Sequence, residues 1–349
     1  MNRYPPHGLL VALVIAAAGP AVAAPGDSVA DFYAGKTITI MVGSSPGGGY
    51  DVDARAVARN VGRHIPGAPT VIVQNMPGAR GLAAANYLFN LAPRDGTFMG
   101  IVEREHLIDS YLMPNGVRYD ERKFNWIGSI GSEQGITFAW HTAPQKKAED
   151  IRTAEFIVGG VSNSLVLPQI YNATMGTRFK IIKGYTGSEN VLLAIEKGEV
   201  QGIANYSLSN MLAKHADWLR DRKINILFQT GETRDALLPN VPSALEFALN
   251  DEKRQVLALW LAPNAVARPF AMPPGVAEER RTALRKAFMA LFKDAEFLAD
   301  ARRIGMSLDP RQGEYIEQLV NRLRSYPPRI IEAAMAAARN QTLMPARKD

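Results

Sequence analysis

Short apolar runs and amphipathic runs alternate along the chain from residue 36 onward. Residues 36–42, 70–74 and 98–102 are rich in β-branched and other apolar side chains and are predicted to be strands. Between the first two, apolar residues recur at helical spacing from Ala54 to Ile65, and Pro66-Gly67 ends that helix. Repeated strand–turn–helix units predict a parallel sheet covered by helices, whose ligands bind beyond the carboxyl ends of the strands.

The second half of the chain repeats this scheme. Its predicted strands are residues 135–140, 156–160, 179–182, 200–203, 224–228 and 256–261. Two long amphipathic helices follow, one around residues 284–292 and one over residues 313–338, which Pro327-Pro328 interrupts. The predicted fold class is therefore α/β.

The first residues have the composition of a secretory signal peptide. Arg3 is the only charged side chain before Asp27 when histidine is neutral, and an apolar run covers residues 9–18. Small residues follow, which predicts cleavage after Ala23 or Ala24. The apolar run is too short to cross a bilayer, and we therefore expect export with cleavage. The alternative is an uncleaved anchor helix.

Composition excludes several classes of protein. With 349 residues, 47% of them hydrophobic and 21% charged, the chain is long enough for two domains with sizeable cores. The net charge of +6 includes no run of five Lys or Arg residues, which argues against a nucleic-acid partner. Cysteine is absent, and this excludes disulfide scaffolds, zinc ribbons, iron–sulfur clusters and thiol catalysis.

Four turns that follow predicted strands have the composition of anion-binding turns. Gly43–Asp51 contains three successive glycines, whose N–H groups can approach a ligand closely, and it precedes a helix with a positive dipole end. Gly159–Ser164 and Tyr185–Ser188 bring hydroxyl groups to two further helix starts, and Pro77–Gly81 adds Arg80. Each turn has an alternative explanation, because Ser, Asp and Gly at such positions also act as plain caps and tight turns.

Enzyme motifs are incomplete in this sequence. No G-x-x-x-x-G-K-[ST] segment occurs, and Val52 stands where a dinucleotide-binding turn has its last glycine. Gly160–Ser164 matches the nucleophile turn of α/β hydrolases except at its final residue. The histidines are too scattered for a metal motif, and the ionisable cluster Glu103–His106 follows a strand end. We therefore predict no catalytic residue, no cofactor and no metal.

Several short segments follow one another in a specific order. They are Lys36–Val42 with the GGG-x-Asp turn, Val73–Gly81, Ala92–Thr97, Gly184–Gly187, Glu196–Val200, Leu238–Ser243, Leu261–Pro263 and Met272–Val276. In this order and spacing they resemble the substrate-binding receptors of tripartite tricarboxylate transporters, also called Bug receptors. The resemblance covers nearly all of the chain after the signal peptide. It implies a type II periplasmic binding-protein fold, in which two α/β lobes enclose a ligand cleft.

The resemblance also implies a division of the chain. The implied parts are a signal peptide over 1–24, a first lobe over 25–130, a second lobe over 131–230, and a return to the first lobe with the C-terminal helices over 231–349. The two crossings between lobes are expected near Gly128–Gly135 and Phe228–Gly231.

Ligand-binding residues can be carried over by position. In the first lobe they are Ser44, Ser45, Gly48, Gly49 and Asp51, and in the second they are Ser162, Asn163, Ser164, Tyr185, Gly187 and Ser188. Asn205 and Tyr206, which follow the predicted strand 200–203, are further candidates of lower rank. Backbone N–H groups of these turns would hold carboxylate oxygens. Arg80 stands where the family usually has glycine, and Arg104 lies in the ionisable cluster. We hypothesise that one of these two arginines contacts a carboxylate directly.

The implied function is that of a periplasmic receptor, a monomer that captures a small organic acid and delivers it to the membrane subunits of a tripartite transporter. Two other functions stay open: a ligand receptor for a sensor protein, and an exported α/β hydrolase with Ser162 as nucleophile. The sequence does not distinguish a dicarboxylate, a tricarboxylate, an aromatic acid or an amide as the ligand.

Overall fold

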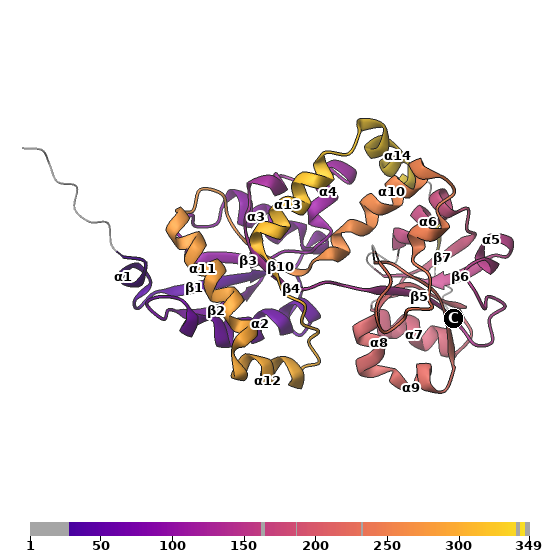
Figure 1. Cartoon of the computed structure of the whole chain (residues 1–349), viewed down its shortest axis with the longest axis horizontal. Helices are drawn as coiled ribbons and strands as arrows, with labels where there is room; N and C mark the ends of the chain where they lie inside the picture. The colour runs from indigo at the N-terminus through magenta and orange to yellow at the C-terminus, as the bar shows by residue number, and fades with distance from the viewer. Residues whose placement is uncertain (1–27, 162–164, 186, 232, 340–342, 346–349) are drawn as a thin grey trace, which may run out of the picture.

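The computed structural model describes residues 28–161, 165–185, 187–231, 233–339 and 343–345, so the predicted signal peptide lies outside it. Two six-stranded sheets form two lobes that lie side by side, each flanked by helices (Figure 1). The expected two-lobed α/β architecture is confirmed. Within the described ranges, no helix is both long and apolar enough to cross a membrane.

The first lobe contains the sheet with the strand order β11-β4-β10-β3-β1-β2. Its strands are β1 (Thr37–Val42), β2 (Thr70–Asn75), β3 (Phe98–Ile101), β4 (Asn125–Gly131), β10 (Ala267–Met272) and β11 (Arg311–Gln312). β1 pairs in parallel with β2 and β3, whereas β10 runs antiparallel to β3 and β4. The three strands predicted in this part of the chain are confirmed, and β4, β10 and β11 are additional.

Helices surround this sheet. They are α1 (Val29–Tyr33), α2 (Gly49–Val61), α3 (Leu82–Asn90), α4 (His106–Leu112), α11 (Glu278–Ala290), α12 (Ala295–Arg303) and α13 (Gly313–Arg324), with short 3₁₀ turns η1 (Gly62–His64), η2 (Ala79–Gly81), η3 (Glu121–Lys123) and η7 (Leu291–Lys293). α14 (Pro328–Arg339) follows α13, so the break expected at Pro327-Pro328 is confirmed.

The second lobe contains the sheet with the order β12-β7-β6-β8-β5-β9. Its strands are β5 (Gly135–Trp140), β6 (Phe156–Gly159), β7 (Phe179–Lys183), β8 (Gly202–Ser207), β9 (Ile224–Gln229) and β12 (Leu343–Pro345). Its helices are α5 (Asp150–Thr153), α6 (Leu167–Met175), α7 (Ser188–Glu196), α8 (Leu208–Lys214), α9 (Ala216–Arg220) and the 3₁₀ turn η5 (Ala244–Phe247). β8 begins two residues later than the strand predicted at 200–203.

The strand predicted at residues 256–261 is wrong, because this segment belongs to the helix α10 (Asp251–Leu261). Asn250 caps the helix by accepting a hydrogen bond from the N–H of Lys253 at 2.9 Å. Five of the six residues 256–261 are buried, and α10 packs against both α6 and α14. Burial on more than one side removes the polar positions that would reveal a helical period.

The chain crosses between the lobes at two places. The first crossing runs through residues 132–134, between β4 and β5, within the expected segment. The second comes later than expected, because α10 still contacts α6 of the second lobe and the chain rejoins the first sheet only at β10, after η6 (Ala262–Ala265). β12 then pairs with β7, so the assignment of all of residues 231–349 to the first lobe does not hold for this strand.

Apolar side chains form one core in each lobe and a third core that joins them. The first lobe packs around Ile40 and the second around Phe138. The third includes Leu107 of α4, Tyr171 of α6 and Leu257 of α10. α14 contacts both α4 and α6, and with α10 it bridges the two lobes at the top of Figure 1. The lobes are therefore joined by packed helices as well as by the two crossing segments.

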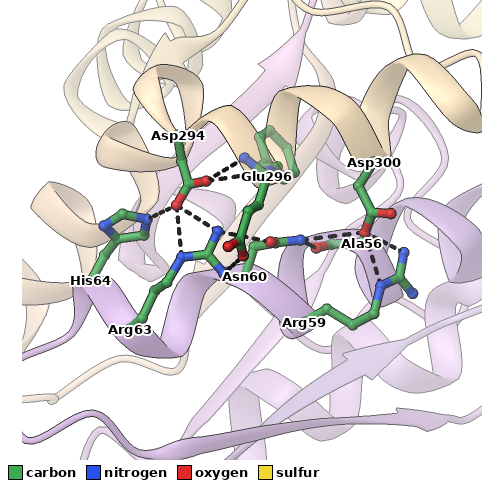
Figure 2. A network of polar contacts seen from close by, with 9 residues as sticks. Ala56, Arg59, Asn60, Arg63, His64, Asp294, Glu296 and Asp300 are labelled. Carbon is green, nitrogen blue, oxygen red and sulfur yellow. Dashed lines mark hydrogen bonds and ion pairs between the residues drawn. The ribbon is translucent and has the colours of Figure 1, made fainter.

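A polar network fixes helix α2, which carries the predicted anion-binding turn at its start. Asp294, the N-cap of α12, accepts hydrogen bonds from Arg63 at 2.7 Å and pairs with His64 at 2.6 Å (Figure 2). Asp300 pairs with Arg59 at 2.7 Å. Arg63 holds the pKa of Asp294 well below its usual range. The network ties the C-terminal half of α2 to α12 and orients the helix.

Candidate functional site

A cleft of about 750 Å³ lies between the two lobes. From the first lobe it is lined by the turns that follow β1 and β3, and from the second by β8 and the start of α7. Open α/β sheets bind ligands at the carboxyl ends of their strands, and this volume is in the range of small-molecule sites. The cleft is therefore the candidate site.

Asp51 holds the shape of the glycine turn. Its carboxylate accepts hydrogen bonds from the N–H of Gly47 at 2.8 Å, from Asn75 at 2.8 Å and from Arg55 at 2.9 Å. Burial alone would raise the pKa of Asp51, but the hydrogen bonds from Arg55, Gly47 and Asn75 lower it to about 2. Asp51 is not among the described residues that line the cleft, so its position fits the alternative role of a turn and helix-start residue.

Ser44, Ser45 and Gly49 of the same turn do line the cleft. The N–H of Gly48 is used by the carbonyl of Ser45 at 3.2 Å, and Gly48 itself is not a lining residue. The N–H groups of residues 49–51 belong to the first helical turn and have no acceptor within the helix, whereas the N–H of Val52 already donates to the carbonyl of Gly48 at 2.9 Å. The buried hydroxyl of Ser44 also has no partner among the described residues. These groups form a small set of unused donors at a helix N-terminus.

The turn around Arg80 touches the glycine turn directly. Gly78, Ala79, Arg80 and Gly81 all have positive φ values, from 47° to 150°. A Cβ atom added to Gly43 would lie 2.7 Å from the Cα of Gly81, so the two backbones leave no room for a side chain there. Non-glycine residues in this region carry a cost of about 1 kcal/mol each. The second turn is therefore strained where it meets the first.

Arg80 and Arg104 both line the cleft, in different environments. Arg80 is about half exposed, and its guanidinium lies 3.8 Å from Asp109. Arg104 is largely buried and pairs with Glu105 at 3.0 Å and Glu133 at 3.4 Å. The charge of Arg104 is thus already balanced by two carboxylates. The direct contact of either arginine with a ligand stays a prediction.

Glu103 follows β3 and carries a carboxylate. The sequence places it in the ionisable cluster and predicts no contact with a ligand for it. It lines the cleft, and its Cγ would lie 2.8 Å from a Cβ added to Gly81. Burial raises the pKa of Glu103 to about 7, and repulsion from Glu105 adds to the shift, while the hydroxyl of Tyr50 opposes it. No described cation lies within ion-pair distance of Glu103.

Arg268 and Tyr50 were not expected in the site, yet both line the cleft. Arg268 lies in β10 with a positive φ of 56° and pairs with Asp53 of α2 at 2.7 Å. Its guanidinium would lie 3.1 Å from a Cβ added to Gly49. A lone arginine in an otherwise apolar strand, Ala267–Met272, was the signal available in the sequence.

His106 opens α4 and also lines the cleft. Its Nδ1 lies 2.7 Å from the carboxylate of Asp109, and the side chain is almost fully buried, with 2% exposed. Its Nε2 has no partner among the described residues and would lie 3.4 Å from a Cβ added to Gly81. From the sequence alone, His106 was assigned to the ionisable cluster without a role.

Of the candidates in the second lobe, Ser188, Asn205 and Tyr206 line the cleft, and Ser207 and Asn210 line it as well. Contact of these residues with a ligand stays a prediction. Asn205 has a φ of 58° and accepts a hydrogen bond from the hydroxyl of Thr230 at 3.0 Å. The other expected residues of this lobe are Tyr185 and Gly187, which are not among the described lining residues, and Ser162, Asn163 and Ser164, which lie outside the described residues.

Comparison with curated proteins found a relative that matches most of the chain. The chain is 26% identical over 289 residues to the "UPF0065 protein in gbd 5'region" of Cupriavidus necator, covering 79% of this chain and 82% of the relative. No protein-family model matches the chain.

Solved structures with the same fold are solute-binding proteins. A TctC solute-binding protein from Polaromonas superposes with a TM-score of 0.65 at 18% identity, covering 86% of this chain and 97% of that one. The periplasmic binding protein BugD gives 0.61 at 17% identity, with coverage of 86% and 97%. MatC from Rhodopseudomonas palustris, solved with malate, gives 0.60 at 18% identity, with coverage of 86% and 99%.

The Polaromonas protein and BugD are described as binding proteins, and the resemblance stated from the sequence is confirmed. The chain has the two-lobed periplasmic binding-protein fold and is similar to TctC-type and Bug-type receptors.

Proposed function

We propose that this protein is an exported receptor that captures a small organic acid between its lobes and delivers it to a tripartite tricarboxylate-type membrane transporter. The observation that carries the proposal is the cleft of about 750 Å³ with unused backbone donors at the start of α2. Two structural neighbours support the chemistry, since one was solved with bound malate and another with adipate.

The chemistry of capture needs no covalent step. A carboxylate at the start of α2 accepts hydrogen bonds from N–H groups of the first helical turn and from Ser44, and it also interacts with the positive end of the helix dipole. Ser188 and Asn205 face the same cleft from the second lobe. A ligand that contacts both lobes favours the closed arrangement, because only that arrangement forms both sets of contacts.

Export, cleavage after Ala23 or Ala24, the monomeric state and docking on membrane subunits are parts of this proposal. Mass spectrometry of the protein recovered from a periplasmic extract measures the cleavage site directly. An intact N-terminus in that fraction would contradict the signal-peptide assignment.

The proposed binding function is tested with the mature chain purified free of carried-over ligand. Thermal-shift measurements with mono-, di- and tricarboxylates, aromatic acids, amino acids, sugars and nucleotides are expected to show a selective shift with organic acids. A ligand at about 100 times its Kd adds roughly 2.7 kcal/mol of stability, which raises the Tm by several degrees. A shift with sugars or nucleotides alone would overturn the organic-acid assignment.

A further inference from the structure

Asn205 lies at a bulge in β8, in the wall of the cleft. The pairing of β5 with β8 shifts its register between Ile136 and Phe138, so that residues 204 and 205 of β8 together face residue 137 of β5. The φ of Asn205 is 58°, in the left-handed region, which asparagine tolerates better than most residues. A bulge redirects the side chain that it carries, and it therefore sets the direction of the Asn205 amide.

The amide of Asn205 packs against Gly135 and Thr230. A Cβ atom added to Gly135 would lie 2.0 Å from the side-chain oxygen of Asn205 and 2.4 Å from the hydroxyl oxygen of Thr230. Thr230 is fully buried, and its hydroxyl lies 3.0 Å from the same amide oxygen. The other end of the amide has no hydrogen-bond partner among the described residues, and Asn205 lines the cleft. One end of this amide is thus held and the other is available to a ligand.

A chain of hydrogen bonds determines which end of the amide faces Thr230. Nδ2 of Asn264 donates to the backbone carbonyl of Thr230 at 3.3 Å, and because a carbonyl only accepts, this contact identifies the nitrogen of the Asn264 amide. The same nitrogen lies 3.3 Å from the hydroxyl oxygen of Thr230, which accepts from it. The single hydroxyl proton of Thr230 is then donated to Asn205. The oxygen of the Asn205 amide therefore faces Thr230, and its NH2 group faces away from it.

Asn264 places this chain of hydrogen bonds at the connection between the lobes. It lies in η6, the last segment before the second crossing returns to β10. Its backbone carbonyl accepts a hydrogen bond at 2.8 Å from the N–H of Glu133, which belongs to the first crossing. The N–H of Thr230 donates to the carbonyl of Gly135 at the start of β5, at 2.9 Å. The two crossing segments and the amide of Asn205 therefore form one hydrogen-bonded unit.

We propose that Thr230 and Asn264 are positioning residues of the ligand site, which hold the NH2 group of Asn205 toward the cleft as a donor to an oxygen atom of the ligand. This inference rests on the proposed receptor function and gives a role to two buried residues that are not among the described lining residues. A donor that is already oriented costs less entropy when the ligand binds. Without the hydroxyl of Thr230 the amide can turn and present its oxygen, which a carboxylate does not bind.

The first experiment measures how Thr230 acts on ligand affinity. The mature protein is titrated calorimetrically with malate, adipate, citrate and benzoate, and with any further acid that raises its Tm. Thr230→Val removes the hydroxyl at nearly constant shape, and we expect the Kd of each acid that binds to rise at least five-fold. Thr230→Ser keeps the hydroxyl, and its Kd should stay within two-fold of that of the unaltered protein. In the Asn205→Ala background, Thr230→Val should change Kd less than two-fold, because the group that Thr230 positions is absent.

A matched control separates positioning from a general loss of stability. Thr174 of α6 is also fully buried, and its hydroxyl donates to the carbonyl of Ile170 at 2.6 Å. Thr174 is not among the described residues that line the cleft. Thr174→Val is therefore expected to lower the Tm and to leave Kd unchanged, whereas Thr230→Val should lower the Tm and raise Kd.

Neutron diffraction from deuterium-exchanged crystals of the unaltered protein tests the direction of the hydrogen bonds without a ligand. We expect the deuterium atom of the Thr230 hydroxyl to point to the side-chain oxygen of Asn205. The two deuterium atoms of the Asn205 amide should point toward the cleft. The reverse orientation of this amide would overturn the inference even if organic acids bind, and the measurement does not depend on how well a variant folds.

The outcomes separate this inference from the function on which it rests. If acids bind and Thr230→Val leaves Kd within two-fold, the positioning role is overturned and the receptor function stands. The same conclusion follows if Thr230→Val raises Kd equally in the presence and in the absence of the Asn205 amide. If no organic acid binds to the unaltered protein, the receptor function fails, and the positioning role fails with it.

Discussion

The guanidinium of Arg268 stacks over the ring of Tyr50, with 4.1 Å between its central carbon and the ring centroid. Tyr50 lies in the first turn of α2, and Arg268 lies in β10, just after the segment that returns from the second lobe. Asp53 anchors the same guanidinium from α2 at 2.7 Å. The start of α2 is therefore held by a strand that begins at the connection between the lobes.

Replacing Arg268 is expected to weaken both the fold and ligand binding. In Arg268→Ala the carboxylate of Asp53 loses its ion-pair partner in a partly buried position, which costs about 2–3 kcal/mol at neutral pH. Burial already raises the pKa of Asp53, and Arg268 opposes that shift. Without Arg268 the folded-state pKa rises further, so stability is lost as the pH rises through it. Urea unfolding at about pH 4 and pH 7 measures the difference.

Two companion variants test the cause of this loss. Asp53→Asn in the Arg268→Ala background is expected to recover part of the stability at neutral pH, because it removes the unpaired carboxyl. Arg302→Ala, at an exposed position of α12, serves as the control for removing an arginine. A loss of equal size at both pH values, without recovery in the double variant, would contradict the ion-pair explanation.

Asp51→Asn is expected to loosen the glycine turn. The ionised carboxylate accepts charge-assisted hydrogen bonds from Gly47, Asn75 and Arg55, and their loss costs about 1–2 kcal/mol. The pKa of Asp51 is lowered to about 2, so its contribution is present above the ordinary value of 3.8 and is lost as the pH falls toward 2. The stability gap between the two proteins should therefore close in acid, which denaturant titrations across this range would show.

Because the two turns are in contact, a side chain at Gly43 is expected to destabilise the protein. Gly43→Ala places a Cβ 2.7 Å from the Cα of Gly81, and the backbone must shift, at a cost of about 1–3 kcal/mol. Ligand affinity is expected to fall with it, because the shift moves the start of α2. Gly187→Ala is the matched control for stability, since its φ is −165° and the nearest atom to the new Cβ lies at 3.6 Å. Equal effects of the two substitutions on Tm would rule out the steric argument.

The parts of the fold that the sequence predicted are those with an undisturbed pattern. Thr37–Val42 and Thr70–Asn75 are β-branched runs bounded by turn residues, and both are strands. β4 contains two glycines, and β10 contains Arg268 and Pro269, with an irregular register after Phe270. Such residues interrupt the strand pattern even though tertiary pairing places both segments inside the sheet.

The site was predictable where backbone chemistry defines it and not where side chains from distant segments meet. The glycine turn is recognisable in the sequence, because Gly47 and Gly48 precede a helix whose first residue is Gly49. Glu103 and Arg268 become neighbours of that turn only through the order β10-β3-β1 in the sheet. A single sequence does not contain this strand order, so the charge balance of the cleft could not be predicted.

The two arginines proposed as ligand contacts are expected to respond differently to substitution. Arg104→Met leaves Glu105 and Glu133 without the cation between them, so the Tm should fall clearly. Arg80→Met removes a half-exposed side chain with one distant partner, and its effect on stability should stay within about 1 kcal/mol. Measuring the Tm of both variants, and their Kd for the ligand of the panel that binds most tightly, separates a role in stability from a role in ligand contact. If Arg80→Met also leaves Kd unchanged, Arg80 is not a ligand contact.

Glu103 should leave a signature in the stability of the empty protein. Its pKa in the folded state is raised to about 7 from an ordinary value of 4.5, so folding favours the protonated carboxyl. Ionisation therefore destabilises the fold as the pH rises from about 5 to about 8, by about 2–3 kcal/mol for a shift of this size. Glu103→Gln removes the titrating group, and its stability should change less over the same range. The Tm of the wild type should therefore fall relative to that of the variant as the pH rises. Parallel curves of Tm against pH would show that Glu103 titrates as an ordinary surface carboxyl.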